Sequence, residues 1–264
     1  MIFKNNLEES YHDAGFDKRE YIDEVFKIYL ETRKENEKRN DTPAHTMYPG
    51  YPHIENTTFS ALRIFEAMKK SGFDLKEIDW ANLGIAGVRH DTGYWKDLED
   101  TEGTGAKLTA QHVKRSMTLA DKYLKKKKFP KRRVELIKEA IDYTEVFGPK
   151  PEITSLGGML AGGDALGLIA DVNYVNVYLP LLWKEFRDFK DDEGKTMNEK
   201  LGYKTIKDIQ GPNSGVFIKK VLLPAVELYL PYLDRITGGE KVNLYRLHIQ
   251  RNLDFLVGTI ELGI

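Results

Sequence analysis

Apolar residues recur at intervals of three and four positions along most of this chain, the spacing that gathers them on one face of an α-helix. The segment 18–38 shows the pattern with Ile22, Val25 and Tyr29. Similar segments follow at 57–70, 108–124, 132–146, 157–169, 175–189 and 217–233. No series of segments shows the period-two alternation of half-buried strands. The sequence therefore predicts an all-α fold, and because no clear linker divides it we expect one domain over residues 1–264.

The composition excludes several kinds of site. The 264 residues include 40 Lys and Arg, 41 Asp and Glu and no Cys, so the formal net charge is −1. Without Cys there are no disulfides, thiolate nucleophiles, Fe–S clusters or Cys-rich zinc sites. A metal ion would have to be held by His, Asp, Glu, Asn or main-chain oxygen. The balanced charge argues against a globally basic nucleic-acid binder, so we do not expect a nucleic-acid partner.

No segment looks like a targeting or membrane-spanning element. The N-terminus has no apolar core of a secretory signal. The longest apolar stretch, 157–172, is shorter than the roughly 20 residues of a membrane helix and carries Asp164 and Asp171. We expect a cytoplasmic protein that does not bind membranes, and the sequence leaves open whether it forms a homo-oligomer.

Two segments stand out from the regular helices. Residues 40–56 hold three prolines and a glycine, which predicts an ordered loop or a lid and not a regular helix. Residues 157–169 are apolar and rich in glycine, which predicts a helix that packs closely against its neighbours. Pro224 is expected to kink the helix predicted at 217–233.

The most informative polar motif is the pair His90 and Asp91, which ends an apolar segment and precedes Thr92-Gly93-Tyr94. An imidazole beside a carboxylate can bind a divalent cation such as Mn, Fe, Co, Ni, Zn or Mg. The alternative is a surface dipeptide without a function. Four of the six histidines lie between residues 45 and 112, so further ligands could come from the same part of the chain.

The segment LGIAGVRHDTGYW resembles the central motif of the HD-domain superfamily of metal-dependent phosphohydrolases. Further segments resemble the rest of the family pattern in order: YPHIENT at 51–57, QHVKRSM with His112, IKEAIDYTEV with Thr144, LAGGDALGLIAD with Asp164, and VYLPLLWKEFRDF after it. The resemblance implies an HD-domain or phosphodiesterase-like helical bundle with a helical C-terminal extension. Its core would span about residues 50–190, and helix 18–38 and the C-terminal helices of 175–264 would pack on that core.

The resemblance also implies a set of metal ligands, namely His90, Asp91 and Asp164 together with a residue of the first motif. The position of the family histidine in that motif falls on Asn56, whereas His53 lies one helical turn earlier. Imidazole is the better ligand for late first-row ions, so His53 is favoured and Asn56 stays as the alternative. His112 is a candidate for an additional ligand.

The resemblance implies hydrolysis of a phosphomonoester or phosphodiester, with nucleotides as the leading class of small-molecule substrate. The catalytic residues would be His90, Asp91 and Arg115, and Lys114, Arg115 and Thr144 would contact the phosphate or the rest of the substrate. One alternative is a degenerate HD fold that binds a nucleotide or a protein without turnover. Another is a helical scaffold in which the His-Asp pair is accidental.

Seven of the nine residues from Lys125 to Arg133 are basic. The segment lies between two predicted helices, which favours a solvated turn. The functional alternative is that the turn steers phosphorylated substrates electrostatically toward a nearby site.

Overall fold

The structure is a computed structural model of the chain. Helices make up 76% of this structure, which confirms the predicted all-α helical bundle. It describes residues 2–40, 51–100, 103–145, 148, 152–188, 190, 193–236 and 243–261, and none of these belongs to a strand. The α-helices are α1 (Ile2–Asp13), α2 (Arg19–Asn40), α3 (Tyr51–Lys70), α4 (Glu77–Arg89), α5 (His112–Lys126), α6 (Lys131–Asp142), α7 (Leu156–Ile169), α8 (Leu179–Asp188), α9 (Met197–Leu201), α10 (Ile206–Ile209), α11 (Pro212–Phe217), α12 (Leu223–Glu227), α13 (Leu230–Ile236) and α14 (Leu244–Glu261). Two short 3₁₀ helices, η1 (Thr92–Tyr94) and η2 (Gly105–Leu108), and two π-helical turns, η3 (Tyr174–Tyr178) and η4 (Ile218–Leu222), complete the described elements.

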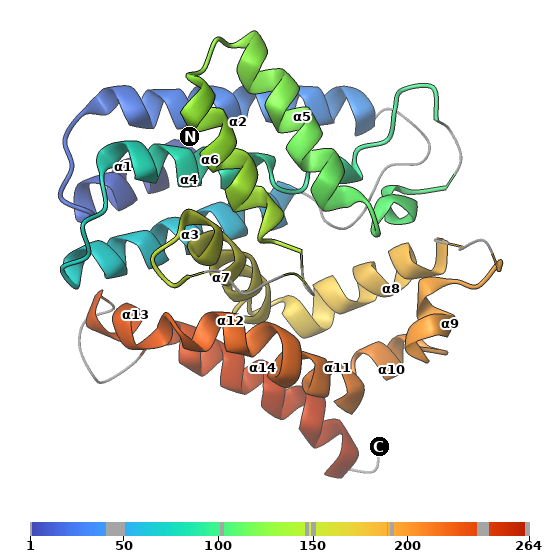
Figure 1. The fold of residues 1–264 in the computed structure, drawn as a ribbon. Helices are drawn as coiled ribbons and strands as arrows, with labels where there is room; N and C mark the ends of the chain where they lie inside the picture. Colours follow the sequence, from blue (N-terminus) through green and yellow to red (C-terminus); the bar gives the residue numbers. More distant parts are fainter. Residues whose placement is uncertain are drawn as a thin grey trace.

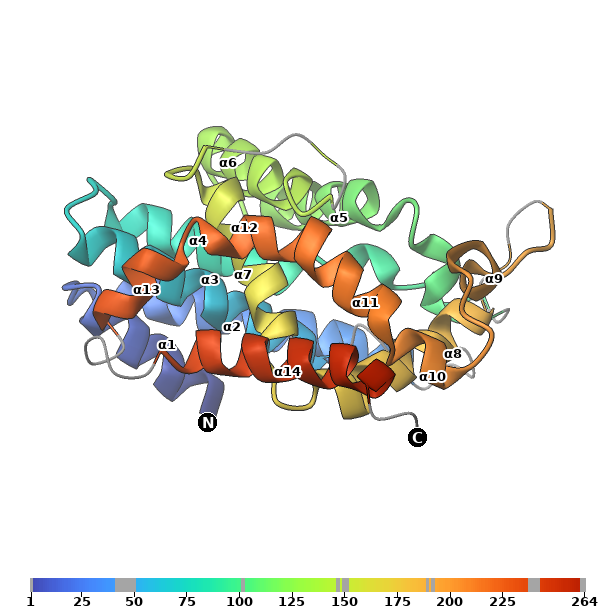
Figure 2. The same cartoon turned by 90° about the horizontal axis from the view of Figure 1, so that it is seen from below.

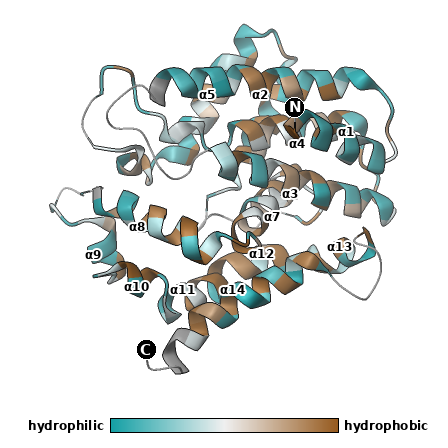
Figure 3. Cartoon of the chain, turned by 180° about the vertical axis from the view of Figure 1, so that it is seen from behind, coloured by the Kyte–Doolittle hydropathy of each residue, from teal (hydrophilic) through white to brown (hydrophobic). Residues whose placement is uncertain are grey.

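Helices α3 and α7 lie against each other at the centre of the bundle (Figure 1). Helices α1 and α4 also contact α3, and α4, α6, α12 and α14 contact α7. The C-terminal helices α11–α13 run beside α14 on the face seen in Figure 2. One cluster of buried apolar residues extends from Phe3 to Leu256. In Figure 3 the hydrophobic colour concentrates on inner helices such as α7 and α12, whereas α2 and α5 show long hydrophilic stretches.

Helix α7 can approach α3 closely because its sequence places small residues on the contact face. A Cβ atom at Gly163 would lie 2.5 Å from the backbone nitrogen of Ala61 and 2.6 Å from its Cα. Real Cβ atoms do not come that close to a backbone, so only glycine fits here. The close packing predicted for 157–169 is therefore present. It brings Asp164, the next residue of α7, to the side of α3.

The prediction that residues 40–56 are not helical is wrong where the structure describes them. Asn40 ends α2, and residues 51–56 form the first turns of α3, while 41–50 lie outside the described residues. Pro52 does not prevent this, because a helix does not use the N–H groups of its first turn. His53 consequently projects from a regular helix and not from a loop.

The C-terminal part is more broken than the sequence suggests. Residues 190–215, where the sequence analysis predicted no helix, contain the short helices α9, α10 and the start of α11. The helix predicted at 217–233 is divided into η4, α12 and the start of α13. In the π turn η4 the N–H of Leu223 donates to the carbonyl of Ile218, five residues earlier. Pro224, which has no N–H, follows directly, in agreement with the expected irregularity.

None of the described helices is by itself both long enough and apolar enough to cross a membrane. Leu156–Ile169 and Tyr174–Arg187 meet the length and hydropathy criteria only as a pair that bends by 82°.

The contact at Gly163 gives a test of the fold. Gly163→Ala should lower the free energy of unfolding by about 1–3 kcal/mol, because the added methyl group overlaps the backbone of α3. Gly258→Ala in α14 is the matched control, since nothing lies within 4 Å of the point that its added methyl group would occupy, and it should be neutral or stabilise by up to about 1 kcal/mol. Urea unfolding followed by circular dichroism measures both, and equal effects of the two changes would contradict the close α3–α7 contact.

Candidate metal centre

Four side chains of the predicted ligand set converge between α3, α4 and α7. His53 comes from the first turn of α3, and Asp164 comes from the middle of α7. His90 caps the C-terminus of α4, and Asp91 follows it at the start of η1. The pair therefore lies at a helix end, where the backbone turns and lets both adjacent side chains face the same point.

The distances place imidazole nitrogens against carboxylate oxygens. His53 Nε2 lies 3.0 Å from Asp164 Oδ1 and 3.3 Å from Asp91 Oδ2. His90 Nε2 lies 3.3 Å from Asp91 Oδ2 and 3.6 Å from Asp164 Oδ1. One ligand atom each of His53, His90 and Asp164 falls within 4.8 Å of the others, close enough for all three to bind one ion.

Main-chain and hydroxyl contacts fix the orientation of these groups. His90 Nδ1 lies 2.7 Å from the carbonyl oxygen of Gly87. Because a carbonyl only accepts, Nδ1 carries the proton, and Nε2 of the neutral ring presents its lone pair to the carboxylates. Thr57, one turn after His53 on α3, donates its hydroxyl to Asp164 Oδ1 over 3.1 Å. These are the supporting contacts that metal-binding histidines and carboxylates usually have.

The pKa values of the four groups are shifted in the directions that keep opposite charges together. Burial opposes protonation of His53, but its hydrogen bonds to Asp164 and Asp91 outweigh burial and raise its pKa to about 9. Burial likewise opposes protonation of His90, whose pKa the charge of Asp91 and contacts with Asp164 raise well above the usual value. Burial favours the neutral form of both carboxyls, yet the two imidazoles hold the pKa of Asp91 and of Asp164 well below the usual range.

The donor set fits a divalent cation. His90 Nε2 is buried, and none of the described residues forms a hydrogen bond of regular geometry with it, although carboxylate oxygens lie nearby. A lone pair that faces carboxylate oxygens repels them unless a proton or a metal ion lies between. Two imidazole nitrogens with carboxylate oxygens suit ions such as Mn, Fe, Co, Ni or Zn. Such an ion would take the place of the protons that the raised histidine pKa values imply.

Of the two candidates in the first motif, His53 lies in the cluster and Asn56 does not. The side-chain amide of Asn56 donates to Asp171 Oδ2 over 2.8 Å, at the C-terminal end of α7. His53 and Thr57 are four residues apart and both reach Asp164, whereas Asn56 is turned aside by the 100° step of the helix. The hydrogen bond to Asp171 thus holds the side chain of Asn56 away from the cluster.

His112 lies at the edge of the cluster, with its Nε2 3.8 Å from Asp91 Oδ1. Its Nδ1 lies 2.7 Å from the carbonyl of Thr109, and its ring stacks on Tyr94 with 4.3 Å between centroids. We did not predict Tyr94 as a site residue. Its position in the sequence, three residues after Asp91, could have indicated that it lies near the site. Gly93 allows this arrangement, because a Cβ there would lie 1.8 Å from the carbonyl oxygen of His112.

The three residues predicted to contact substrate lie in different surroundings. Arg115 donates from Nε to the carbonyl of Gly93 and from Nη2 to that of Trp95, each over 2.9 Å, so it holds the η1 loop. Lys114 is exposed on α5. Thr144 is buried, donates to the carbonyl of Ile141 and lines a cavity beside Asp164. A phosphate contact of any of the three stays a prediction.

The basic segment Lys125–Arg133 joins α5 to α6, at the opposite end of α5 from His112. With a rise of about 1.5 Å per residue, this places it roughly 20 Å away along the helix. Several of its cations are paired: Lys125 with Asp121 at 2.7 Å, Lys127 with Glu31 at 2.6 Å, and Arg133 with Glu24 at 2.6 Å. The distance and the pairing favour a solvated turn over steering of substrate.

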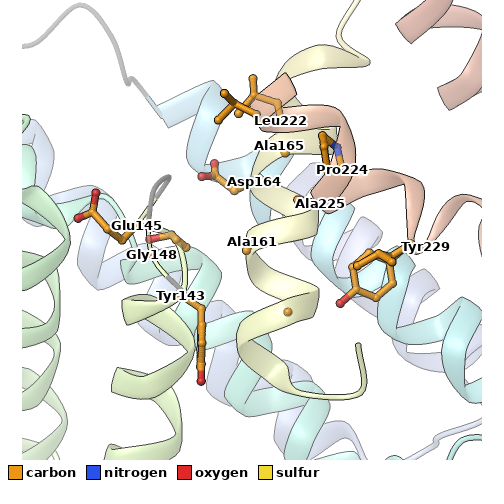
Figure 4. Close-up of a pocket in the computed structure, with 14 residues that line it drawn as sticks. Tyr143, Glu145, Gly148, Ala161, Asp164, Ala165, Leu222, Pro224, Ala225 and Tyr229 are labelled. Carbon is orange, nitrogen blue, oxygen red and sulfur yellow. The ribbon is translucent and has the colours of Figure 1, made fainter. Parts of the chain in front are cut away.

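A cavity of about 130 Å³ opens beside Asp164. Figure 4 shows Asp164 with Ala161 and Ala165 on α7, facing Glu145 and Gly148 on one side and Leu222, Pro224 and Ala225 on another. Asp164 is thus shared by the cavity and the cluster of imidazoles.

A sequence profile of the Npun_R2479-like family matches residues 97–251, more than half of the 264 residues. The chain belongs to the Npun_R2479-like family. The matched part includes His112 and Asp164 and begins after His53, His90 and Asp91. No curated protein and no solved structure matches the chain. The name of the family specifies no reaction.

The placement of His53 and Asn56 predicts different effects of their removal. His53→Ala should weaken binding of a divalent ion by at least about 100-fold, because a ligand is lost. Asn56→Ala should leave binding nearly unchanged. Elemental analysis of protein purified without an affinity tag measures retained metal, and circular dichroism controls for folding. Equal metal content in wild type and His53→Ala would remove His53 from the ligand set.

The raised histidine pKa values predict how metal affinity depends on pH. Between pH 6 and pH 8, below the pKa of about 9 of His53, the metal-free site holds protons that a metal ion must displace. Affinity should therefore rise with pH, by about tenfold per pH unit for each proton released. Calorimetric titration with Mn²⁺ or Zn²⁺ in buffers of different ionisation enthalpy counts these protons. An affinity that is constant over this range would show that the imidazoles are not the ligands.

Proposed function

We propose that this chain is a metal-dependent phosphohydrolase of the HD type that acts on a phosphomonoester or a phosphodiester. The observation that carries the proposal is the convergence of His53, His90 and Asp164 within 4.8 Å, with Asp164 also lining a cavity. A scattered arrangement of the same residues would have ended the hypothesis. The order of the motifs along the chain, with the His-Asp pair between two further ligand positions, supports the HD resemblance.

In this proposal His53, His90, Asp91 and Asp164 hold the cation. When bound, a divalent ion supplies Lewis acidity, which activates water and polarises a phosphoryl oxygen. The carbonyl of Gly87 keeps the ring of His90 in the tautomer that offers Nε2. Thr57 orients Asp164 from α3, so that its carboxylate stays directed at the two imidazoles.

Asp91 and His112 are placed to handle the proton of the attacking water. Asp91 Oδ2 faces the imidazoles, and Oδ1 is directed toward His112. Because Nδ1 of His112 is bonded to the carbonyl of Thr109, its neutral ring offers Nε2 as an acceptor 3.8 Å from Asp91 Oδ1. A water between these two groups could give up its proton to either, which is general base catalysis by positioned side chains. Arg115 acts on this pair by holding the η1 loop.

The expectation of a nucleotide substrate and of phosphate contacts by Lys114, Arg115 and Thr144 comes from the resemblance alone, and neither is part of this proposal. The competing proposal, a degenerate HD fold that binds a ligand without turnover, required a first motif without a usable histidine. The position of His53 beside Asp164 favours the catalytic form.

Hydrolysis of p-nitrophenyl phosphate and bis(p-nitrophenyl) phosphate with Mn²⁺, Co²⁺, Ni²⁺, Zn²⁺ or Mg²⁺ tests the proposal. Asp91→Asn should lower kcat at least about 100-fold, because it removes a charge that holds the ion and a proton acceptor. Asp121→Asn, at the far end of α5, is the matched control and should keep wild-type kcat. Absence of metal-dependent hydrolysis with every ion, or full activity of Asp91→Asn, would overturn the proposal.

A further inference from the structure

The cavity beside Asp164 adjoins the candidate metal centre, because Asp164 belongs to both. The side chains of His53, His90 and Asp91 are 7%, 1% and 6% exposed, whereas that of Asp164 is 26% exposed. Asp164 is also part of the cavity wall. The part of a substrate that does not react would therefore extend from the centre past Asp164 into this space.

The wall beyond Asp164 is mainly apolar. Ala161 and Ala165 lie three residues before and one residue after Asp164 on α7, and their short side chains leave space open (Figure 4). Leu222, Ala225 and Leu228 form the opposite side. An apolar wall stabilises apolar groups in proportion to the area removed from water and offers little to a sugar or a second phosphate.

The backbone is shaped to form this wall. Leu222 ends the π turn η4, where the N–H of Leu223 bonds to the carbonyl of Ile218, and Pro224 follows. A π turn inserts one residue into a helix and widens it locally, and such turns are frequent at functional sites. Here Val221 and Leu222 of the widened turn line the cavity.

The charge of the wall selects against polyphosphates. Glu145 lines the cavity together with Asp164, so two acidic side chains border it (Figure 4). One phosphoryl group could be neutralised at the metal centre, but a second phosphate in the cavity would face the carboxylate of Glu145. The size is restrictive as well, because about 130 Å³ is slightly less than the roughly 150 Å³ apolar cavity that holds benzene in another protein.

We propose that the cavity binds the apolar alcohol portion of a phosphomonoester, an alkyl or aryl group of up to about six carbons. The inference rests on the proposed phosphohydrolase function and specifies its substrate class. Water attacks phosphorus, the bond between phosphorus and the alcohol oxygen breaks, and the alcohol leaves with a proton that water supplies, so that the products are the alcohol and inorganic phosphate.

A series of unactivated esters tests the proposal: ethyl, butyl and hexyl phosphate, with glycerol phosphate and a nucleoside 5′-monophosphate for comparison. These alkyl alcohols are similar leaving groups, so differences report binding of the chain. Each added methylene should raise kcat/KM about three- to fourfold until the cavity is filled. Glycerol phosphate and the nucleotide should react more slowly than hexyl phosphate. A rate independent of chain length, or a preference for the nucleotide, would overturn the inference.

Substitutions in the cavity wall test whether the preference for long alkyl chains arises in the cavity. Ala225→Phe should fill the cavity and lower kcat/KM for hexyl phosphate at least about tenfold, with little effect on ethyl phosphate. Leu228→Asn should reduce the same preference without a risk to folding, because Leu228 is 50% exposed. Val216→Phe, at an exposed position of α11 outside the cavity, is the matched control. If both wall variants keep the wild-type preference, the cavity does not bind the chain.

Binding of non-hydrolysable phosphonates shows whether the hydrolase proposal or the assignment of the cavity is the one that fails. Hexylphosphonate should bind the Mn²⁺-loaded protein more tightly than ethylphosphonate, and Ala225→Phe should remove the difference. If this occurs while no ester is hydrolysed, the assignment of the cavity stands and the hydrolase proposal fails. If esters are hydrolysed but the phosphonates bind equally, the hydrolase proposal stands and the assignment of the cavity is wrong.

Discussion

Two carboxylates and two imidazoles are held together in the interior of this bundle, and their charges can only be tolerated as a set. Isolated burial of Asp91 or Asp164 would be costly, and an unprotonated imidazole lone pair directed at either would add repulsion. A cation between them, whether protons or a metal ion, resolves both problems. The stability of the fold therefore depends on the cation in the cluster. The positive charge that would act in catalysis also offsets the cost of burying Asp91.

The contact between α3 and α7 makes this clustering feasible. His53 and Thr57 come from α3, and Asp164 comes from α7, so the distance between the two helix axes sets the distance between ligands. The small residue at Gly163 brings the helices close enough for a 3.0 Å contact between His53 and Asp164. The cavity also depends on small side chains, because Ala161 and Ala165 leave space on the neighbouring face of α7.

Much of this arrangement could be predicted from the sequence. Apolar periodicity indicated α2, most of α3, α5, α6 and α7 but not α1, and the glycine-rich segment predicted close packing around Asp164. His53 was favoured over Asn56 for its ligand chemistry and not for its position, because the prolines of 40–56 suggested a loop, whereas Pro52 occupies a first helical turn. Arg115 was assigned to phosphate because its charge is visible in the sequence, whereas the two carbonyls that it contacts belong to a loop whose path only tertiary packing determines.

The rings of His90 and His112 are oriented in the same manner, each by a carbonyl oxygen three residues earlier in its own chain segment. No side chain takes part in either contact, so no point substitution of a neighbour can release the ring while the backbone stays in place. Fraying of a helix end would do so: the C-terminus of α4 for His90 and the entry to α5 for His112. Release of either ring is thereby tied to local unfolding, and the lifetime of any ion bound through His90 would depend on the C-terminus of α4 and its amide hydrogen exchange.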